Sequence, residues 1–90
     1  MRLKVPEETA ALIRHSHPAL KRRIREALRT IVEDPTSGKP LVDELQGLRS
    51  FRLGRIRIVY AINESDSIDI VTIGPRKRIY EETYRIISRK

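Results

Sequence analysis

Apolar residues recur at helical spacing in the first half of the chain. Within residues 18–33 they occupy positions 20, 24, 27, 28 and 31, which lie on one face of an α-helix. A shorter helix is expected before it, because Pro6 suits a first helical position and Glu7 and Glu8 complement the positive end of the helix dipole. This helix should end near Pro18, since the residue before a proline is disfavoured in the helical region. The two segments predict an antiparallel helical hairpin.

The second half of the chain alternates as β-strands do. Residues 49–53 and 55–62 predict two strands joined by a tight turn at Gly54. In the second of these strands the alternation separates two faces, Ile56, Ile58, Tyr60 and Ile62 on one, and Arg55, Arg57, Val59 and Ala61 on the other.

Three further segments complete the expected fold. "IDIVTIG", ending at Gly74, follows a polar turn and predicts another strand, and "MRLKV" predicts a short first strand. Residues 79–90 have helical spacing, with acidic residues early and basic residues late, as the helix dipole favours. The order β-α-α-β-β-β-α predicts an α+β fold, with helices packed on a small, mostly antiparallel sheet. At 90 residues, the chain is expected to form a single domain, 1–90.

Composition narrows the functional classes. The chain lacks cysteine, which excludes disulfides and thiolate chemistry, and it lacks an apolar run long enough for a signal peptide or a membrane span. A cytoplasmic protein with no membrane association is therefore expected. The net charge of +7 attracts polyanions, of which nucleic acid is the commonest in the cytoplasm. An acidic protein partner, or solubility alone, would also account for this charge.

The stretch "LRSFRLGRIRIVY", residues 48–60, concentrates arginine. Arg49, Arg52, Arg55 and Arg57 occur there without an acidic residue among them. A solvated sheet face, with the arginine stems lying over apolar neighbours, is one explanation. Arg57 favours another, because it lies in mid-strand between two isoleucines, where a long cation is costly unless its face opens onto an anion. The hairpin is therefore a candidate anion-binding site.

A second basic cluster begins where the last strand is expected to end. In "GPRKRIY", residues 74–80, three cations at Arg76, Lys77 and Arg78 precede Tyr80. Neighbouring strand ends in a sheet would bring this cluster close to Arg57. The alternative is an ordinary basic loop that starts a helix, with Tyr80 packed in the core.

Several catalytic classes have no sequence support. His15 and His17 have no third ligand in view and are expected to be surface residues of a helix connection. The chain has no glycine-rich phosphate loop, zinc-finger spacing or nucleophile elbow, and no carboxylate pair is spaced for two metals. No metal and no cofactor are expected, so cleavage of nucleic acid would have to proceed without metal.

The element order and two motifs resemble the RelE/ParE superfamily of toxins from bacterial and archaeal toxin–antitoxin pairs. The first motif is Arg-x-Gly-x-x-Arg from Arg52 to Arg57, running into a strand with Tyr60. The second is Gly-x-Arg from Gly74 to Arg76, followed by Tyr80. The resemblance covers essentially the whole chain and favours the RelE-like branch.

The resemblance implies specific roles for these residues. The RelE-like branch is similar to a metal-independent ribonuclease that cuts messenger RNA in the ribosomal A site. By position, Arg57 matches the arginine at the scissile phosphate, Arg76 matches the arginine after the last strand, and Tyr80 matches the tyrosine near the attacking 2′-hydroxyl. Ser50 and Pro75 depart from the pattern, in which basic residues or histidine are frequent. The remaining cations are expected to bind RNA, namely Arg49, Arg52, Arg55, Lys77 and Arg78.

The implied chemistry suits these residue types. Attack by a ribose 2′-oxygen builds negative charge around phosphorus, and guanidinium groups are permanently charged, bidentate donors to such oxygens. Messenger RNA, the ribosome and a wrapping acidic or amphipathic antitoxin are the implied partners. Two alternatives stay open: a ParE-like gyrase poison without nuclease activity, and a basic module that only binds RNA or an acidic peptide.

Overall fold

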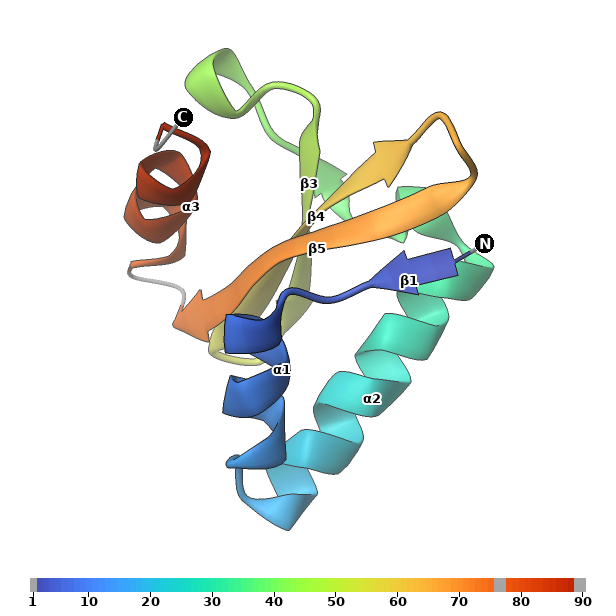
Figure 1. Cartoon of the computed structure of the whole chain (residues 1–90), viewed down its shortest axis with the longest axis vertical. Coiled ribbons are helices and arrows are strands. Elements are labelled where there is room, and N and C mark those ends of the chain that lie inside the picture. Colours follow the sequence, from blue (N-terminus) through green and yellow to red (C-terminus); the bar gives the residue numbers. More distant parts are fainter. Residues whose placement is uncertain (1, 76–77, 89–90) are drawn as a thin grey trace.

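A computed structural model describes residues 2–75 and 78–88 of the chain. Its elements are β1 (Arg2–Lys4), α1 (Glu7–Arg14), α2 (Pro18–Glu33), β2 (Lys39–Pro40), β3 (Leu48–Leu53), β4 (Ile56–Asn63), β5 (Ser67–Pro75) and α3 (Ile79–Ile87) (Figure 1). Short 3₁₀ helices at Pro35–Ser37 and Asp43–Leu45 flank β2. The sequence predicted the other helices and strands closely but not β2 or these two turns. Among the described residues, no helix has the length and apolarity needed to cross a bilayer.

The sheet is mostly antiparallel, which confirms the predicted α+β fold. Its five strands have the order β1-β5-β4-β3-β2, and only the short β1 runs parallel to its neighbour, β5. The hairpin between β3 and β4 closes at Gly54, whose φ of 61° suits the first central residue of a two-residue turn. The helices α1 and α2 form the predicted hairpin, and α3 lies apart from it (Figure 1).

One of the two histidines, His17, has a structural role at the boundary between α1 and α2. His17 occupies the N-cap position of α2, where its Nδ1 accepts a hydrogen bond from the backbone N–H of Ala19 at 3.1 Å. Pro18 follows at the first helical position, where its missing N–H costs nothing. His17 therefore has a local structural role, and it lies at the surface of the helix connection as expected.

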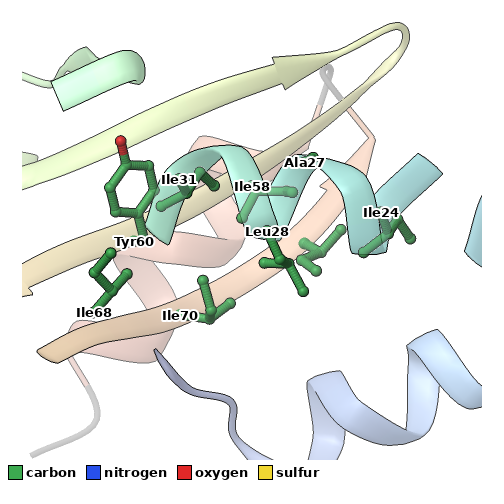
Figure 2. Packing of buried hydrophobic residues seen from close by; sticks show 9 residues of the cluster. Ile24, Ala27, Leu28, Ile31, Ile58, Tyr60, Ile68 and Ile70 are labelled. Carbon is green, nitrogen blue, oxygen red and sulfur yellow. The ribbon is translucent and has the colours of Figure 1, made fainter. Parts of the chain in front are cut away.

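One face of the sheet packs against α2 and forms the core. The predicted stripe of α2 meets alternate residues of β4 and β5, and the cluster consists of Ile24, Ala27, Leu28, Ile31, Ile58, Tyr60, Ile68, Ile70 and Ile73 (Figure 2). All nine are buried. Ile62 lies on the same face of β4 but near the strand end, and it is 41% exposed. We call this side of the sheet the core face.

Tyr60 connects this core to the segment after α2. Its ring is fully buried, and its hydroxyl donates to the carbonyl of Pro35 at 2.6 Å and accepts from the N–H of Gly38 at 2.9 Å. A Cβ at Gly38 would lie 2.5 Å from the Tyr60 hydroxyl oxygen, so only glycine permits this approach. These contacts fix where the chain enters β2.

We expect Tyr60→Phe to lower the free energy of unfolding by about 1–3 kcal/mol, because it leaves the buried N–H of Gly38 without a partner. Urea denaturation measures the change. Tyr84→Phe, which removes a hydroxyl from a half-exposed ring, is the control and should leave stability within about 0.5 kcal/mol of the parent chain. Equal stability of the two variants would contradict the anchoring role of Tyr60.

Candidate functional site

The register between β3 and β4 places two arginines side by side. Arg52 is paired directly with Arg57, so both side chains project from the same face of the sheet, opposite to the core face. On the other side of Arg57, β5 contributes Gly74, which has no side chain. Like charges directly opposite each other destabilise a sheet, so this arrangement favours an anionic ligand.

Arg57 has few partners of its own. Among the described residues its guanidinium makes one hydrogen bond, from Nη1 to the hydroxyl of Ser50 at 3.5 Å, and its buried Nε–H has no partner. The ion pairs of residues 2–75 and 78–88 are Arg14–Glu7 and Arg85–Glu82, so no described carboxylate neutralises Arg57. Of the five N–H donors of the guanidinium, the buried Nε–H is the one whose lack of a partner is unfavourable. This residue therefore has donors available for an anion.

A groove opens in front of Arg57. Its volume is about 450 Å³, and it is lined by Lys39, Pro40, Leu41, Val42, Leu45, Arg57 and Tyr80. We call it the Arg57 groove. Tyr80 is 40% exposed, so it is not the core residue that the alternative interpretation of "GPRKRIY" required. The structure thus brings together two of the three residues predicted to be catalytic.

The placement of Tyr80 depends on how α3 meets the sheet. The helix buries Ile79 and Thr83, and the Thr83 hydroxyl returns a hydrogen bond to the Ile79 carbonyl at 2.7 Å. A Cβ on Gly74 would lie 3.3 Å from Cδ1 of Ile79, so α3 packs on the Arg57 face where β5 has no side chain. Gly74 therefore allows Ile79 to pack closely on β5. This contact places the next residue, Tyr80, at the Arg57 groove.

Arg49 is not part of this arrangement. The register pairs it with Tyr60, which places it on the core face, and its Nη1 donates to the carbonyl of Gly38 at 2.6 Å. A longer contact of 3.4 Å reaches the carbonyl of Thr36. Arg49 therefore supports the same segment that Tyr60 anchors, and the structure does not bring it to Arg57.

The other predicted cations lie in different places. Arg55 is exposed in the turn between β3 and β4. Arg78 lines a separate groove between α1 and α3, together with Glu7, Glu8 and Glu82. Arg76 and Lys77 lie outside the described residues. Of the residues in "GPRKRIY" that were predicted to approach Arg57, Tyr80 lines the Arg57 groove. Arg78 lines a different, partly acidic groove.

One cation of the Arg57 groove, Lys39, was not predicted from the sequence. Lys39 lies in β2 directly opposite Ser50, on the same face of the sheet as Arg57. A two-residue strand has no periodicity to reveal it, and the breaker segment "DPTSGKP" predicted only a loop. Among residues 2–75 and 78–88, no three His, Asp or Glu side chains converge as a metal site requires.

Arg52 and Arg49 make a matched pair of variants, because they belong to one strand but to opposite faces. We expect Arg52→Ala to leave the free energy of unfolding unchanged or to raise it by up to about 1 kcal/mol, since a like-charge pair is removed. Arg49→Ala should lower it by about 1.5–3 kcal/mol, because the Gly38 carbonyl loses a charged donor. Urea denaturation tests both.

The same experiment with added inorganic phosphate separates the faces further. Phosphate should stabilise the parent chain and Arg49→Ala, and it should stabilise Arg52→Ala less, since a ligand that binds the folded state raises its stability. The assignment of the two faces fails if both variants respond to phosphate alike.

Comparison with solved structures shows the same fold. A mutant of the Escherichia coli toxin RelE in the free state has a TM-score of 0.75 at 15% identity, with 96% of each chain covered. The RelBE2 toxin–antitoxin complex from Mycobacterium tuberculosis gives 0.72 at 24% identity, covering 83% of this chain and 96% of that one. An archaeal RelE–RelB complex from Pyrococcus horikoshii gives 0.68 at 25% identity, covering 86% and 96%. All three resemble this chain over most of its length.

Sequence comparison identifies the family. A search of the curated proteins found no significant match. The family model described as "ParE toxin of type II toxin-antitoxin system, parDE" matches residues 4–80, which include the core, the β3–β4 hairpin and Tyr80. The predicted resemblance is therefore confirmed, and the chain belongs to the ParE toxin family of type II toxin–antitoxin systems, within the RelE/ParE superfamily.

Proposed function

We propose that this toxin is a metal-independent endoribonuclease that cleaves messenger RNA, at the ribosomal A site, by attack of a 2′-hydroxyl on the neighbouring phosphodiester. The observation that carries the proposal is the shared groove of Arg57 and Tyr80, with Arg52 directly beside Arg57. A phosphate ester bound at Arg57 would have a phenol within the same groove. The resemblance of the Arg52–Arg57 and Gly74–Arg76 motifs to the RelE-like branch also supports the nuclease, since that branch is similar to a messenger-cleaving ribonuclease.

Arg57 is assigned to the transition state. The attacking and leaving oxygens and the two non-bridging oxygens share increasing negative charge around phosphorus, and a fixed, partly buried guanidinium stabilises this charge more than water does. Ser50 orients the guanidinium through the contact at Nη1. Arg76, which lies outside the described residues, is proposed to stabilise the leaving oxygen.

Tyr80 is assigned as the general base, or as the group that orients the attacking 2′-hydroxyl. Its position in the first turn of α3 leaves the ring 40% exposed at the groove, where substrate can reach it. The 2′-oxygen gives its proton to the base and bonds to phosphorus, the P–O5′ bond breaks, and the leaving 5′-oxygen takes up a proton. The products are a 2′,3′-cyclic phosphate and a 5′-hydroxyl, and later hydrolysis of the cyclic phosphate by water gives the 3′-phosphate. Lys39, which lines the groove, and Arg52, which is paired with Arg57, are proposed to hold the RNA backbone. Arg55 and Arg78, which lie outside the groove, and Lys77, which lies outside the described residues, stay proposed contacts to more distant RNA, and Arg49 has a structural role instead.

A second candidate is a gyrase poison without nuclease activity. The description of the matching family model favours it, because it names ParE toxins. The fold is shared by both activities, so the choice depends on the groove rather than on the architecture. The co-location of Tyr80 and Arg57 supports the nuclease over the poison.

Variants of the groove test the nuclease. Arg57→Ala and Tyr80→Phe should each lower the cleavage rate by about 10²-fold or more and relieve growth arrest, because they remove charge stabilisation and proton transfer. Mapping of messenger 5′ ends after controlled expression measures cleavage. Arg29→Ala, which removes an exposed arginine of α2, is the matched control and should cleave like the parent. Growth arrest with intact messenger and broken DNA would instead establish the ParE-like activity.

An antitoxin is proposed as the physiological partner. The similar M. tuberculosis and P. horikoshii structures are toxin–antitoxin complexes. The charges at Arg52 and Arg57, which no carboxylate of the described residues neutralises, would attract acidic side chains of a segment that folds on binding.

Co-expression with the product of the neighbouring open reading frame should give a soluble complex in which RNA cleavage is suppressed. Pulldown and gel filtration measure the complex, and a scrambled antitoxin segment of equal charge controls for non-specific attraction. If the neighbour fails to bind, or if the scrambled segment binds equally well, the proposed partnership is wrong.

A further inference from the structure

A second groove lies beside the Arg57 groove, along α3. It has a volume of about 780 Å³ and is lined by Glu44, Leu45, Tyr80, Glu81, Tyr84, Arg85 and Ser88. We call it the Tyr84 groove. Leu45 and Tyr80 line both grooves, so the two lie next to each other. A ligand whose phosphate lies at Arg57 can therefore extend past Tyr80 towards Tyr84.

Tyr84 has no role in the packing of the core. Its residue is 51% exposed, whereas the buried contacts of α3 come from Ile79 and Thr83. Tyr80 and Tyr84 are one turn apart, which places them on the same side of the helix, about 6 Å apart along its axis. Two adjacent exposed aromatic rings are costly to leave in water and form a surface suited to stacking.

The charges around Tyr84 show which part of a nucleotide fits. Glu44 and Glu81 line this groove, and Nη1 of Arg85 lies 3.9 Å from a carboxylate oxygen of Glu82. Two carboxylates repel a phosphate, so the backbone is favoured at Lys39 and Arg57 instead. A neutral, planar group is favoured beside Tyr84 and Leu45, and the base N–H groups could donate to the carboxylates.

We infer that the Tyr84 groove binds one unstacked base of a single-stranded RNA, with the base stacked on the Tyr84 ring and its backbone directed to the Arg57 groove. This inference rests on the proposed function, since it names the part of the substrate next to the cleaved bond. Stacking of bases on aromatic side chains is the usual way in which proteins hold single strands. Duplex RNA, whose bases are already stacked, should bind poorly.

Binding of a non-cleavable oligonucleotide tests the inference. The probe is a fluorescein-labelled single-stranded RNA in which each 2′-hydroxyl is replaced by 2′-O-methyl, measured by anisotropy against the purified chain. Tyr84→Ala should weaken binding about 5- to 150-fold, while Tyr84→Phe, which keeps the ring, should bind within about 3-fold of the parent. Thermal denaturation confirms that both variants fold. Equal losses in the two variants would overturn the stacking role.

A series of abasic oligonucleotides locates the base. At one position, loss of the base should weaken binding to the parent chain but should not weaken binding to Tyr84→Ala further, because both changes remove the same contact. If the two losses multiply at every position, no base stacks on Tyr84 and the inference is wrong. The same conclusion follows if Tyr84→Ala weakens antitoxin binding and leaves RNA binding unchanged, which would make the groove a peptide site.

The outcomes separate this inference from the nuclease. Binding of the methylated probe does not require cleavage, so coupling between Tyr84 and one base can persist in a chain that fails to cut messenger. In that case the proposed ribonuclease is wrong and the base site stands. Cleavage that depends on Arg57 and Tyr80 but is unaffected by Tyr84→Ala, without coupling in the abasic series, supports the nuclease and overturns the base site.

Discussion

The pairing register of β3 and β4 is the constraint on which the rest of the structure depends. It aligns Phe51 with Ile58, and Leu53 with Ile56, on the core face, and the same register sets Arg52 against Arg57 on the other face. A slip by one residue would expose the aliphatic set and bury the cations, which is prohibitive. The energy of the core therefore holds two like charges together. No local preference of the hairpin would do so, because like charges directly opposite repel each other.

The difference between the aliphatic core face and the arginine-bearing face of the sheet explains where the helices pack. The α2 helix covers the core face with a broad aliphatic stripe, and Tyr60 extends that contact to the segment that leads into β2. The α3 helix covers the other face with only Ile79 and Thr83 buried. Because α3 buries only these two side chains against the sheet, part of that face stays uncovered beside the helix. The Arg57 groove lies there. The side chains of the groove are held by the sheet and by Gly38, Tyr60 and Gly74, none of which lines it.

The sequence predicted those parts of the fold that have a period. The bounds of α2 were predicted as 18–33, and the alternation of β4 assigned Ile58 and Tyr60 to the core correctly, because each pattern extends over several residues. It also predicted that Arg57 and Tyr80 belong to one site. Arg49 was grouped with Arg57 because they are close in sequence, although a two-residue turn at Gly54 already implies that Arg49 lies opposite Tyr60. Pairing across the turn, rather than nearness along the chain, therefore determines the face on which Arg49 lies.

Other features left no comparable signal. The position of Lys39 depends on a two-residue strand and on a hydrogen bond between Gly38 and Tyr60, residues that are far apart in the sequence. The outward direction of Tyr84 depends on which residues of α3 become buried, and a nine-residue helix with isoleucines on several sides does not decide this by spacing alone. Both features arise from tertiary contacts, so they could be found only once the sheet and α3 were placed.

The separation of the core face from the groove explains how one superfamily can include proteins of different activity. The family model and the similar toxins are matched over segments that include the core face, where aliphatic size and alternation suffice to specify the fold. The groove residues contribute little to that packing: Arg52 and Tyr80 are exposed, and Arg57 is only partly buried. They can change while the fold is retained, which is why likeness at 15–25% identity establishes the architecture and leaves the chemistry to the groove. A single anionic group is enough to relieve the repulsion between Arg52 and Arg57, and a phosphate of the proposed RNA substrate or an acidic side chain of the proposed antitoxin would supply one. Competition between the two for the same charges would give the antitoxin a direct means of inhibition, without any change in the core.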